Sequence, residues 1–211
     1  MACAEGDDAE VGGGGAAPLY AGVVQGATVE GVRIAWARTT PGDRRETGRG
    51  LIRALAAELA PGADLRIEQR CPVCGGPHGR PLLPHAPLLA SAAYAGPWVV
   101  VAVARRQDAD ALGIDVELEG AAPELSLLFA PADPPDLRGW TAIEAALKAD
   151  GRGLMVPPDR VRLSPGLSRG GYATVPDGGG FRILPVAAAP GTIVTLALRR
   201  PGPDPTPTRR P

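Results

Sequence analysis

Short segments of the chain alternate between apolar and polar residues or are apolar throughout, and such patterns predict β-strands. Residues 31–37 (GVRIAWA) alternate like a half-buried strand, and residues 98–104 (WVVVAVA) form an apolar run typical of a buried strand. Residues 112–117 (LGIDVE) are expected to form the next strand, after a hairpin through residues 105–110.

Other segments repeat apolar residues at helical spacing. Residues 48–59 carry leucines on one stripe and stop before a Pro-Gly pair, which predicts a helix. Residues 125–129 predict a short helical piece, and residues 140–149, rich in Ala and Leu, predict a strong helix. Near the end of the chain, residues 181–186 and 192–198 are expected to form an antiparallel strand pair.

This order of elements predicts an α+β fold built from two similar α/β lobes, because each half supplies one helix and some strands. A division near residues 107–111 gives an N-terminal lobe over residues 19–108 and a C-terminal lobe over residues 109–200. Residues 1–18, rich in Gly, Ala and acidic residues, are expected to be a flexible leader. Residues 201–211, rich in Pro, are expected to be a disordered tail.

Composition excludes some classes of function. The 211 residues carry a net charge of −1, which argues against nucleic-acid binding through a broad basic surface. The longest apolar run is far shorter than the roughly 20 residues that span a bilayer. No signal peptide is recognisable, so a cytoplasmic protein without a membrane partner is expected. Among 22 Lys and Arg residues, Lys148 is the only lysine.

The sequence GIDVE at residues 113–117 contains the first candidate site. On a strand, Asp115 and Glu117 project from the same face, while Ile114 and Val116 point to the other face and into a core. Two adjacent carboxylates repel each other unless a cation lies between them, and their hard oxygen ligands suit Mg²⁺. The alternative is an ordinary exposed strand edge with acidic side chains.

The predicted helix over residues 140–149 contains the second candidate site. Trp140, Glu144 and Lys148 follow one another at intervals of four residues and share a helix face. The alternative is a solvated Glu–Lys pair beside a tryptophan that fills the core. The only lysine of the chain and the glycine-rich sequence that follows, GRGL, favour a functional role.

The sequence CPVCGGPHGRP at residues 71–81 contains the third. Cys71, Cys74, His78 and His85 have the residue types of zinc ligands, although a second C-x-x-C pair is missing. The other interpretation, which the Pro and Gly content favours, is a shaped loop that presents His78 and Arg80. A guanidinium at that position suits a phosphate group.

Basic residues gather at the start of the first predicted helix, and they make the fourth candidate site. Arg44, Arg45, Arg49 and Arg53 lie within three helical turns, where clustered guanidinium groups can bind an anion. A solvated basic face is the alternative. The motifs of P-loop nucleotide-binding proteins, α/β-hydrolases and zinc metalloproteases are missing from the sequence.

Taken in order, these motifs resemble the surfactin-type 4′-phosphopantetheinyl transferases. The matching segments are GRGLIR at 48–53, CPVCGGPHGRP at 71–81, GIDVE at 113–117 and WTAIEAALKADGRGL at 140–154. The resemblance implies two similar α/β lobes related by pseudo-two-fold symmetry, with coenzyme A and Mg²⁺ between them. It also implies a monomer that transfers the phosphopantetheine arm of coenzyme A to a serine of an acyl or peptidyl carrier protein in polyketide or nonribosomal peptide biosynthesis.

The resemblance also assigns metal-binding and catalytic roles by position. Asp115 and Glu117 resemble the Mg²⁺ ligands of the family, and Asp133 stands where a third acidic ligand is expected. Glu144 resembles the general base, or metal-linked acid, near the serine hydroxyl of the carrier. Lys148 resembles the lysine that contacts a phosphate of coenzyme A.

Further residues match the region that holds the nucleotide. Arg45, Arg49, His78 and Arg80 are expected to bind the phosphates of coenzyme A, and Tyr94 stands in the turn where the family has Ser and His. A phenol cannot carry positive charge near neutral pH, so weaker coenzyme A binding is predicted. The family lysine that precedes the catalytic glutamate is Ile143 here. The alternative function is therefore a member of this fold that binds coenzyme A or a carrier-tethered ligand without transferring it.

Overall fold

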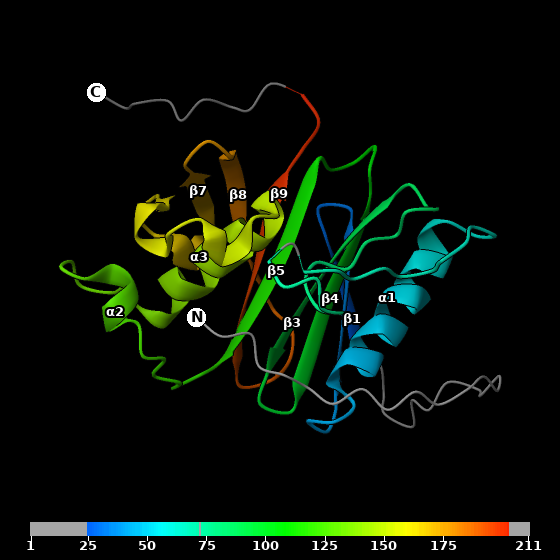
Figure 1. Ribbon diagram of the computed structural model, residues 1–211, viewed down its shortest axis with the longest axis horizontal. Coiled ribbons are helices and arrows are strands. Elements are labelled where there is room, and N and C mark those ends of the chain that lie inside the picture. Colours follow the sequence, from blue (N-terminus) through cyan, green and yellow to red (C-terminus); the bar gives the residue numbers. More distant parts are fainter. Residues whose placement is uncertain (1–24, 72, 203–211) are drawn as a thin grey trace.

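The computed structural model describes residues 25–71 and 73–202, which form a mixed α/β fold with two antiparallel sheets (Figure 1). The α+β class expected from the sequence is confirmed. The predicted leader over residues 1–18 and residues 203–211 of the predicted tail lie outside the described residues.

The first sheet has the strand order β1-β2-β4-β3. Its strands are β1 (Gln25–Val29), β2 (Val32–Arg38), β3 (Leu88–Ala95) and β4 (Trp98–Arg105). The helix α1 (Arg44–Leu59) connects β2 to the long loop before β3 and packs against β2 and β4. The patterns over residues 31–37, 48–59 and 98–104 therefore predicted β2, α1 and β4 correctly.

The second sheet has the strand order β5-β9-β8-β7-β6. Its strands are β5 (Ala111–Leu118), β6 (Arg162–Leu163), β7 (Gly171–Val175), β8 (Gly179–Val186) and β9 (Thr192–Arg199). β8 and β9 form the antiparallel pair predicted near the end of the chain.

Helices of the second half lie between β5 and β7 in the sequence. They are α2 (Ser126–Phe129), α3 (Leu137–Asp150) and three short 3₁₀ turns, η1 (Gly153–Met155), η2 (Pro158–Arg160) and η3 (Leu167–Arg169). The Asp136 carboxylate caps α3 by accepting a hydrogen bond of 2.7 Å from the Gly139 amide, and Gly151 ends the helix with a φ of 92°. The helix predicted over residues 140–149 therefore starts one turn earlier, at its aspartate cap.

The elements stack in four layers, helix on sheet on sheet on helix (Figure 1). One apolar core lies between the two sheets and includes Ile34 of β2, Val100 of β4 and Ile114 of β5. A second core joins α3 to the outer face of the second sheet, and a third joins α1 to the outer face of the first. Each sheet is thus buried on both faces, which explains its long apolar strands.

The predicted hairpin through residues 105–110 is wrong. β4 lies between β2 and β3, so both of its hydrogen-bonding edges are taken before β5 begins. The turn after β4 instead carries the chain from the first sheet into the second, where β5 pairs with β9. An apolar pattern predicts a strand but does not specify its partner, which is why the sequence suggested the nearest neighbour.

The two sheets meet where β3 and β5, the edge strands, lie side by side. The Ile114 amide donates a buried hydrogen bond of 3.0 Å to the Ser91 hydroxyl, because β5 has no ladder partner on that side. At another contact between the halves, Arg182 lies 2.6 Å from the Glu30 carboxylate. Over residues 25–71 and 73–202, no helix is long and apolar enough to cross a membrane.

Candidate functional site

β5 presents its two acidic side chains to α3, as the two-residue period of the strand predicted. Leu112, Ile114 and Val116 enter the core between the sheets, so the residues between them face the helix. Gly113 allows the helix to approach closely. A Cβ atom at this position would lie 2.1 Å from the Ala145 carbonyl oxygen, which no real structure tolerates. Because Gly113 has no side chain, the part of β5 that carries Asp115 and Glu117 can pack directly against α3.

Three carboxylates converge at this contact. Asp115, Glu117 and Glu144 each offer an oxygen atom, and these atoms all lie within 4.8 Å of one another. Asp115 is only 2% exposed, and its Oδ1 accepts a hydrogen bond of 2.6 Å from the Lys148 ammonium. Its Oδ2 is buried and no N–H or hydroxyl donor of the described residues reaches it, while the neighbouring Glu144 carboxyl can share a proton with Asp115. A buried carboxylate oxygen without a partner is costly, so this atom is ready to accept a cation or a proton.

All three carboxyl groups have raised pKa values. Burial raises the pKa of Asp115, and the neighbouring Lys148 ammonium opposes this effect without cancelling it. Burial and the charge of Asp115 raise the pKa of Glu117. The pKa of Glu144 rises from 4.5 to about 7, first because of burial and second because of the charge of Asp115. Near neutral pH, Glu144 can therefore both accept and release a proton.

Lys148 supplies a positive charge to this cluster. Burial alone would lower the pKa of Lys148, but the negative charges of Asp115 and Glu144 outweigh burial and raise it. One ammonium does not balance three ionised carboxylates, so the fully ionised cluster is net negative. Hard carboxylate oxygens at this spacing suit a divalent cation such as Mg²⁺.

Two further residues of the sequence motifs, Asp133 and Ile143, do not contribute to the carboxylate cluster. Asp133 is exposed in the segment between α2 and α3, and it is not part of the carboxylate cluster. Ile143 is 2% exposed and belongs to the core beneath α3. Trp140, on the helix face with Glu144, is also buried and packs edge-on against Phe129, with ring centroids 6.2 Å apart. Its side chain also interacts with Glu117 and moderates the raised pKa of that group.

Tyr94 connects the carboxylate cluster to α1. Its hydroxyl lies against Gly48, where a Cβ atom would be 2.8 Å away. Burial raises the pKa of Tyr94, while the positive charges of Arg49, Lys148 and Arg45 act in the opposite direction. These three cations therefore come close to one phenol from two different layers of the fold.

Arg80 reaches the same region from the loop before β3. Its Nη1 lies 3.4 Å from the position of a Cβ atom on Gly151, directly after the end of α3. Burial and the nearby Arg106 guanidinium lower the pKa of Arg80. Within the described part of the chain, neither arginine forms an ion pair with an acidic residue. The positive charge of Arg106 acts on Arg80, and a region with two positive charges suits an anion. Sequence reasoning missed Arg106.

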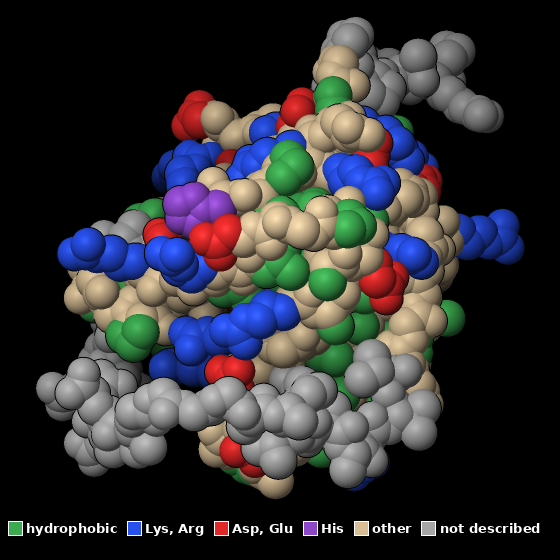
Figure 2. All heavy atoms as spheres, turned by 90° about the vertical axis from the view of Figure 1, so that its right-hand side faces the viewer, with side chains coloured by type: hydrophobic (Ala, Val, Ile, Leu, Met, Phe, Trp, Pro, Cys, Tyr) green, Lys and Arg blue, Asp and Glu red, His purple; other side chains and the backbone are tan. Residues whose placement is uncertain are grey.

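The remaining arginines at the start of α1 have separate roles. Arg44 donates a hydrogen bond to the Gly96 carbonyl, and Arg49 donates one to the Gln69 side chain. Arg53 forms an exposed ion pair with Glu46. Figure 2 looks onto the side of the molecule that carries α1 and shows several Lys and Arg side chains toward the left of the view. Arg53 is therefore engaged with Glu46 at the surface, as the solvated alternative predicts for that residue.

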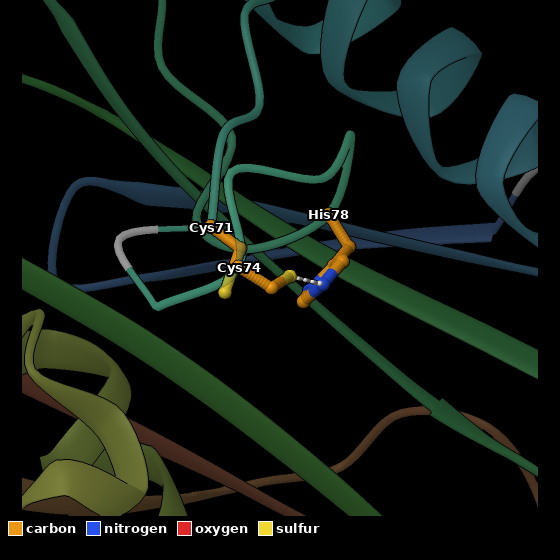
Figure 3. Close-up of side chains that lie close together, drawn as sticks. All are labelled: Cys71, Cys74 and His78. Carbon is orange, nitrogen blue, oxygen red and sulfur yellow. Dashed lines mark hydrogen bonds between the residues drawn. The ribbon is translucent and has the colours of Figure 1, made fainter. Parts of the chain in front are cut away.

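The loop with the CPVCGGPHGRP sequence brings three potential ligands together. The donor atoms of Cys71, Cys74 and His78 lie within 4.8 Å of one another (Figure 3). Cys74 Sγ and His78 Nε2 are 3.0 Å apart. His85 is exposed and does not belong to this group.

The chain matches no model of a known protein family and none of the curated proteins. Its function is therefore inferred from the geometry of these residues and from their motifs.

Proposed function

We propose that this protein is a Mg²⁺-dependent phosphopantetheinyl transferase, which moves the 4′-phosphopantetheine arm of coenzyme A to a serine of an acyl or peptidyl carrier protein. The observation that carries the proposal is the carboxylate cluster of Asp115, Glu117 and Glu144 beside Lys148. These residues come from the two motifs, GIDVE and the WTAIEAALK helix, on which the resemblance to the family depends. The carrier protein belongs to a polyketide or nonribosomal peptide pathway.

The carboxylate cluster fits the metal that this reaction needs. Asp115, Glu117 and Glu144 would hold Mg²⁺, with the unpartnered Oδ2 of Asp115 as one ligand atom. A bound Mg²⁺ neutralises pyrophosphate charge. Glu144 is the third acidic residue of the cluster, a role that the resemblance to the family had suggested for Asp133.

The side chains around the cluster suit the other tasks of the transfer. As a metal-linked group, the Glu144 carboxylate would accept the proton of the carrier serine hydroxyl as that oxygen attacks the phosphorus, whereas its pKa of about 7 describes the cluster without metal. The Lys148 ammonium donates a hydrogen bond to a phosphate oxygen of coenzyme A. It also stabilises the negative charge that develops on the leaving 3′,5′-ADP.

The nucleotide and its phosphates would lie against the basic groups from both halves. Arg45 and Arg49 belong to α1, and their charges act with that of Lys148 on Tyr94. Arg80 approaches Gly151 at the C-terminal end of α3. His78, on the loop of Arg80, is the remaining candidate contact. Because no acidic residue pairs with Arg80 in the described chain, a phosphate would satisfy its guanidinium without breaking an ion pair.

The architecture supports a site at a border between lobes. Each sheet packs one long helix on its outer face, so two similar lobes related by pseudo-two-fold symmetry would place β3 and β5 at their boundary. All the proposed site residues lie in one chain, which is consistent with a monomer, and we propose the cytoplasm as its location.

Two observations favour the alternative of a protein that binds coenzyme A or a carrier-tethered ligand without transferring it. The Lys148 ammonium already pairs with Asp115 at 2.6 Å, so a positive charge is present beside the most buried carboxylate without any metal ion. In addition, Ile143 fills the core at the position of the family lysine. Such a site would bind the anionic ligand without needing Mg²⁺.

An intact-mass assay distinguishes the two functions. Apo carrier proteins of both kinds are incubated with the full chain, coenzyme A and either Mg²⁺ or EDTA, beside a known transferase as positive control. We expect the carrier to gain one phosphopantetheine arm, only with Mg²⁺. Asp115→Asn and Glu144→Gln should abolish the gain, while Glu119→Gln, which changes an exposed carboxylate outside the cluster, should leave it unchanged.

Failure would have a definite meaning. If the positive control modifies the carriers and this protein modifies none of them, it is not a transferase for these carriers. Isothermal titration with coenzyme A then tests the alternative, which requires binding that EDTA does not weaken. If Asp115→Asn transfers as fast as the parent, the assigned site is wrong.

A further inference from the structure

A second cluster of donor atoms lies in the loop before β3, apart from the carboxylates. Cys71 and Cys74 contribute sulfur atoms and His78 contributes an imidazole nitrogen, and the three atoms lie within 4.8 Å of one another. Figure 3 shows both sulfur atoms and the imidazole at the same end of the loop. We propose that these three residues bind a Zn²⁺ ion, independently of the transferase function.

The loop backbone holds the donors in place before any ion binds. The Gly75 amide donates a hydrogen bond of 2.9 Å to the Cys71 carbonyl, and the Cys71 amide donates one of 2.9 Å to the Gly76 carbonyl. This tight turn needs the φ of 74° at Gly75, which a residue with a side chain rarely adopts. The turn therefore places two cysteines, three positions apart, on one side of the loop.

The base of the loop is closed as well. Glu68 and Leu82 exchange two backbone hydrogen bonds, each 2.9 Å long. Between them, the Gln69 amide group donates to the Gly79 carbonyl at 2.9 Å. The donors thus lie in a segment that hydrogen bonds hold at both ends. Ion binding therefore costs little conformational entropy.

The spacing of the donors fits a tetrahedral ion. Zinc bonds of about 2.3 Å to sulfur and about 2.0 Å to nitrogen separate the two ligand atoms by roughly 3.5 Å at a tetrahedral angle. Cys74 Sγ and His78 Nε2 are 3.0 Å apart, so the pair must open by roughly half an ångström. Cys74 is exposed, and a rotation of its side chain provides that movement.

The donor chemistry selects the ion. Two thiolates and a neutral imidazole are soft or borderline ligands, which favour Zn²⁺ over Mg²⁺. Binding releases one proton from each thiol, and the resulting site is electrically neutral. Three protein ligands leave a fourth tetrahedral position for a water molecule. The carboxylate cluster, with oxygen donors alone, has the opposite preference.

The ion would stabilise the segment that carries Arg80. This arginine follows His78 by two residues and reaches Gly151 at the end of α3. With the ion on Nε2, the other ring nitrogen of His78 carries a proton and can donate a hydrogen bond to a phosphate.

Elemental analysis of the purified full chain tests the proposal. The protein is kept reduced, equilibrated with Zn²⁺ and a weak competing chelator, and analysed for zinc bound per chain. We expect one ion per chain in the parent and in His85→Ala, which removes the exposed histidine outside the group. Cys71→Ser and Cys74→Ser should lose the ion, and His78→Ala should weaken binding at least tenfold. Circular dichroism checks that each variant is folded.

Cobalt substitution gives a second measurement that is specific for the donor atoms. Co²⁺ bound here should produce a thiolate-to-metal charge-transfer band and the visible bands of a tetrahedral site, and Cys74→Ser should remove them. Asp115→Asn should retain them, because the carboxylates cannot produce a thiolate band. The proposal is overturned if the reduced parent binds no zinc and shows no thiolate band. It is also overturned if Cys74→Ser binds zinc like the parent, or if the two cysteines form a disulfide under these reducing conditions.

Discussion

The charge of Glu144 destabilises the metal-free protein, and the sign and size of this effect can be worked out. The pKa of Glu144 rises from 4.5 to about 7 on folding, because of burial and the charge of Asp115. Between these pH values the folded state binds more protons than the unfolded state, so the free energy of unfolding falls as pH rises. A shift from 4.5 to about 7 corresponds to roughly 3 kcal/mol, reached when pH exceeds about 7.

Glu144→Gln removes this ionisation while keeping the shape of the protonated side chain. Without metal at pH 8, we expect the variant to be more stable than the parent by about 2–3 kcal/mol. At pH 5 the two proteins should differ little, because the parent already carries the proton. Asp115 and Glu117 interact with Glu144, so the measured difference also includes the change in their own ionisation when Glu144 is replaced.

Urea denaturation at pH 5 and pH 8, in EDTA and then in Mg²⁺, measures the effect. Glu119→Gln is the matched control, since its exposed carboxylate should give no pH-dependent difference. Mg²⁺ should stabilise the parent at pH 8 through mass action on the folded state, and should stabilise Glu144→Gln much less. If the variant is less stable than the parent at pH 8 in EDTA, the electrostatic reasoning about this cluster is refuted.

Three further substitutions test the surroundings of the cluster. Gly113→Ala should destabilise the protein by about 3 kcal/mol or more, measured by urea denaturation, because the new Cβ would lie 2.1 Å from the Ala145 carbonyl oxygen. Asp136→Ala should cost about 1 kcal/mol in the same measurement through loss of the α3 cap, and an unchanged midpoint would contradict that role. Lys148→Met should cost about 1–3 kcal/mol at pH 8 because it leaves the buried Asp115 unpaired, and Mg²⁺ should recover part of the loss. A thermal melt that Mg²⁺ does not shift in this variant would argue against a metal at Asp115.

Local sequence patterns correctly predicted the helices and strands in which the spacing of apolar residues shows which face is buried. The helices α1 and α3 follow their apolar spacing, and the two-residue period of β5 correctly predicted that Asp115 and Glu117 share a face. The strand β3 was missed because LLASAAYA has little alternation, and β1 because QGATV has few apolar residues. Their strand character depends on pairing with β4 and β2, which is not visible locally.

Contacts between distant residues were harder to predict. The charge of Arg106, in the turn after β4 where the chain changes sheets, acts on Arg80, whereas the sequence suggested a hairpin there. Asp133 is separated from the cluster although its sequence position resembles that of a ligand. In contrast, the CxxC and histidine spacing pointed to a cluster that the turn at Gly75 makes possible.

The adjoining edges of β3 and β5 also have a consequence for solubility. A sheet edge with free amides and carbonyls is a template for pairing with other chains, and here each sheet covers an edge of the other. Cutting the chain between the sheets would uncover both edges together with the apolar faces that meet between them. Fragments ending at Arg106 or starting at Gln107 should therefore aggregate when expressed alone, and should become soluble when they are co-expressed.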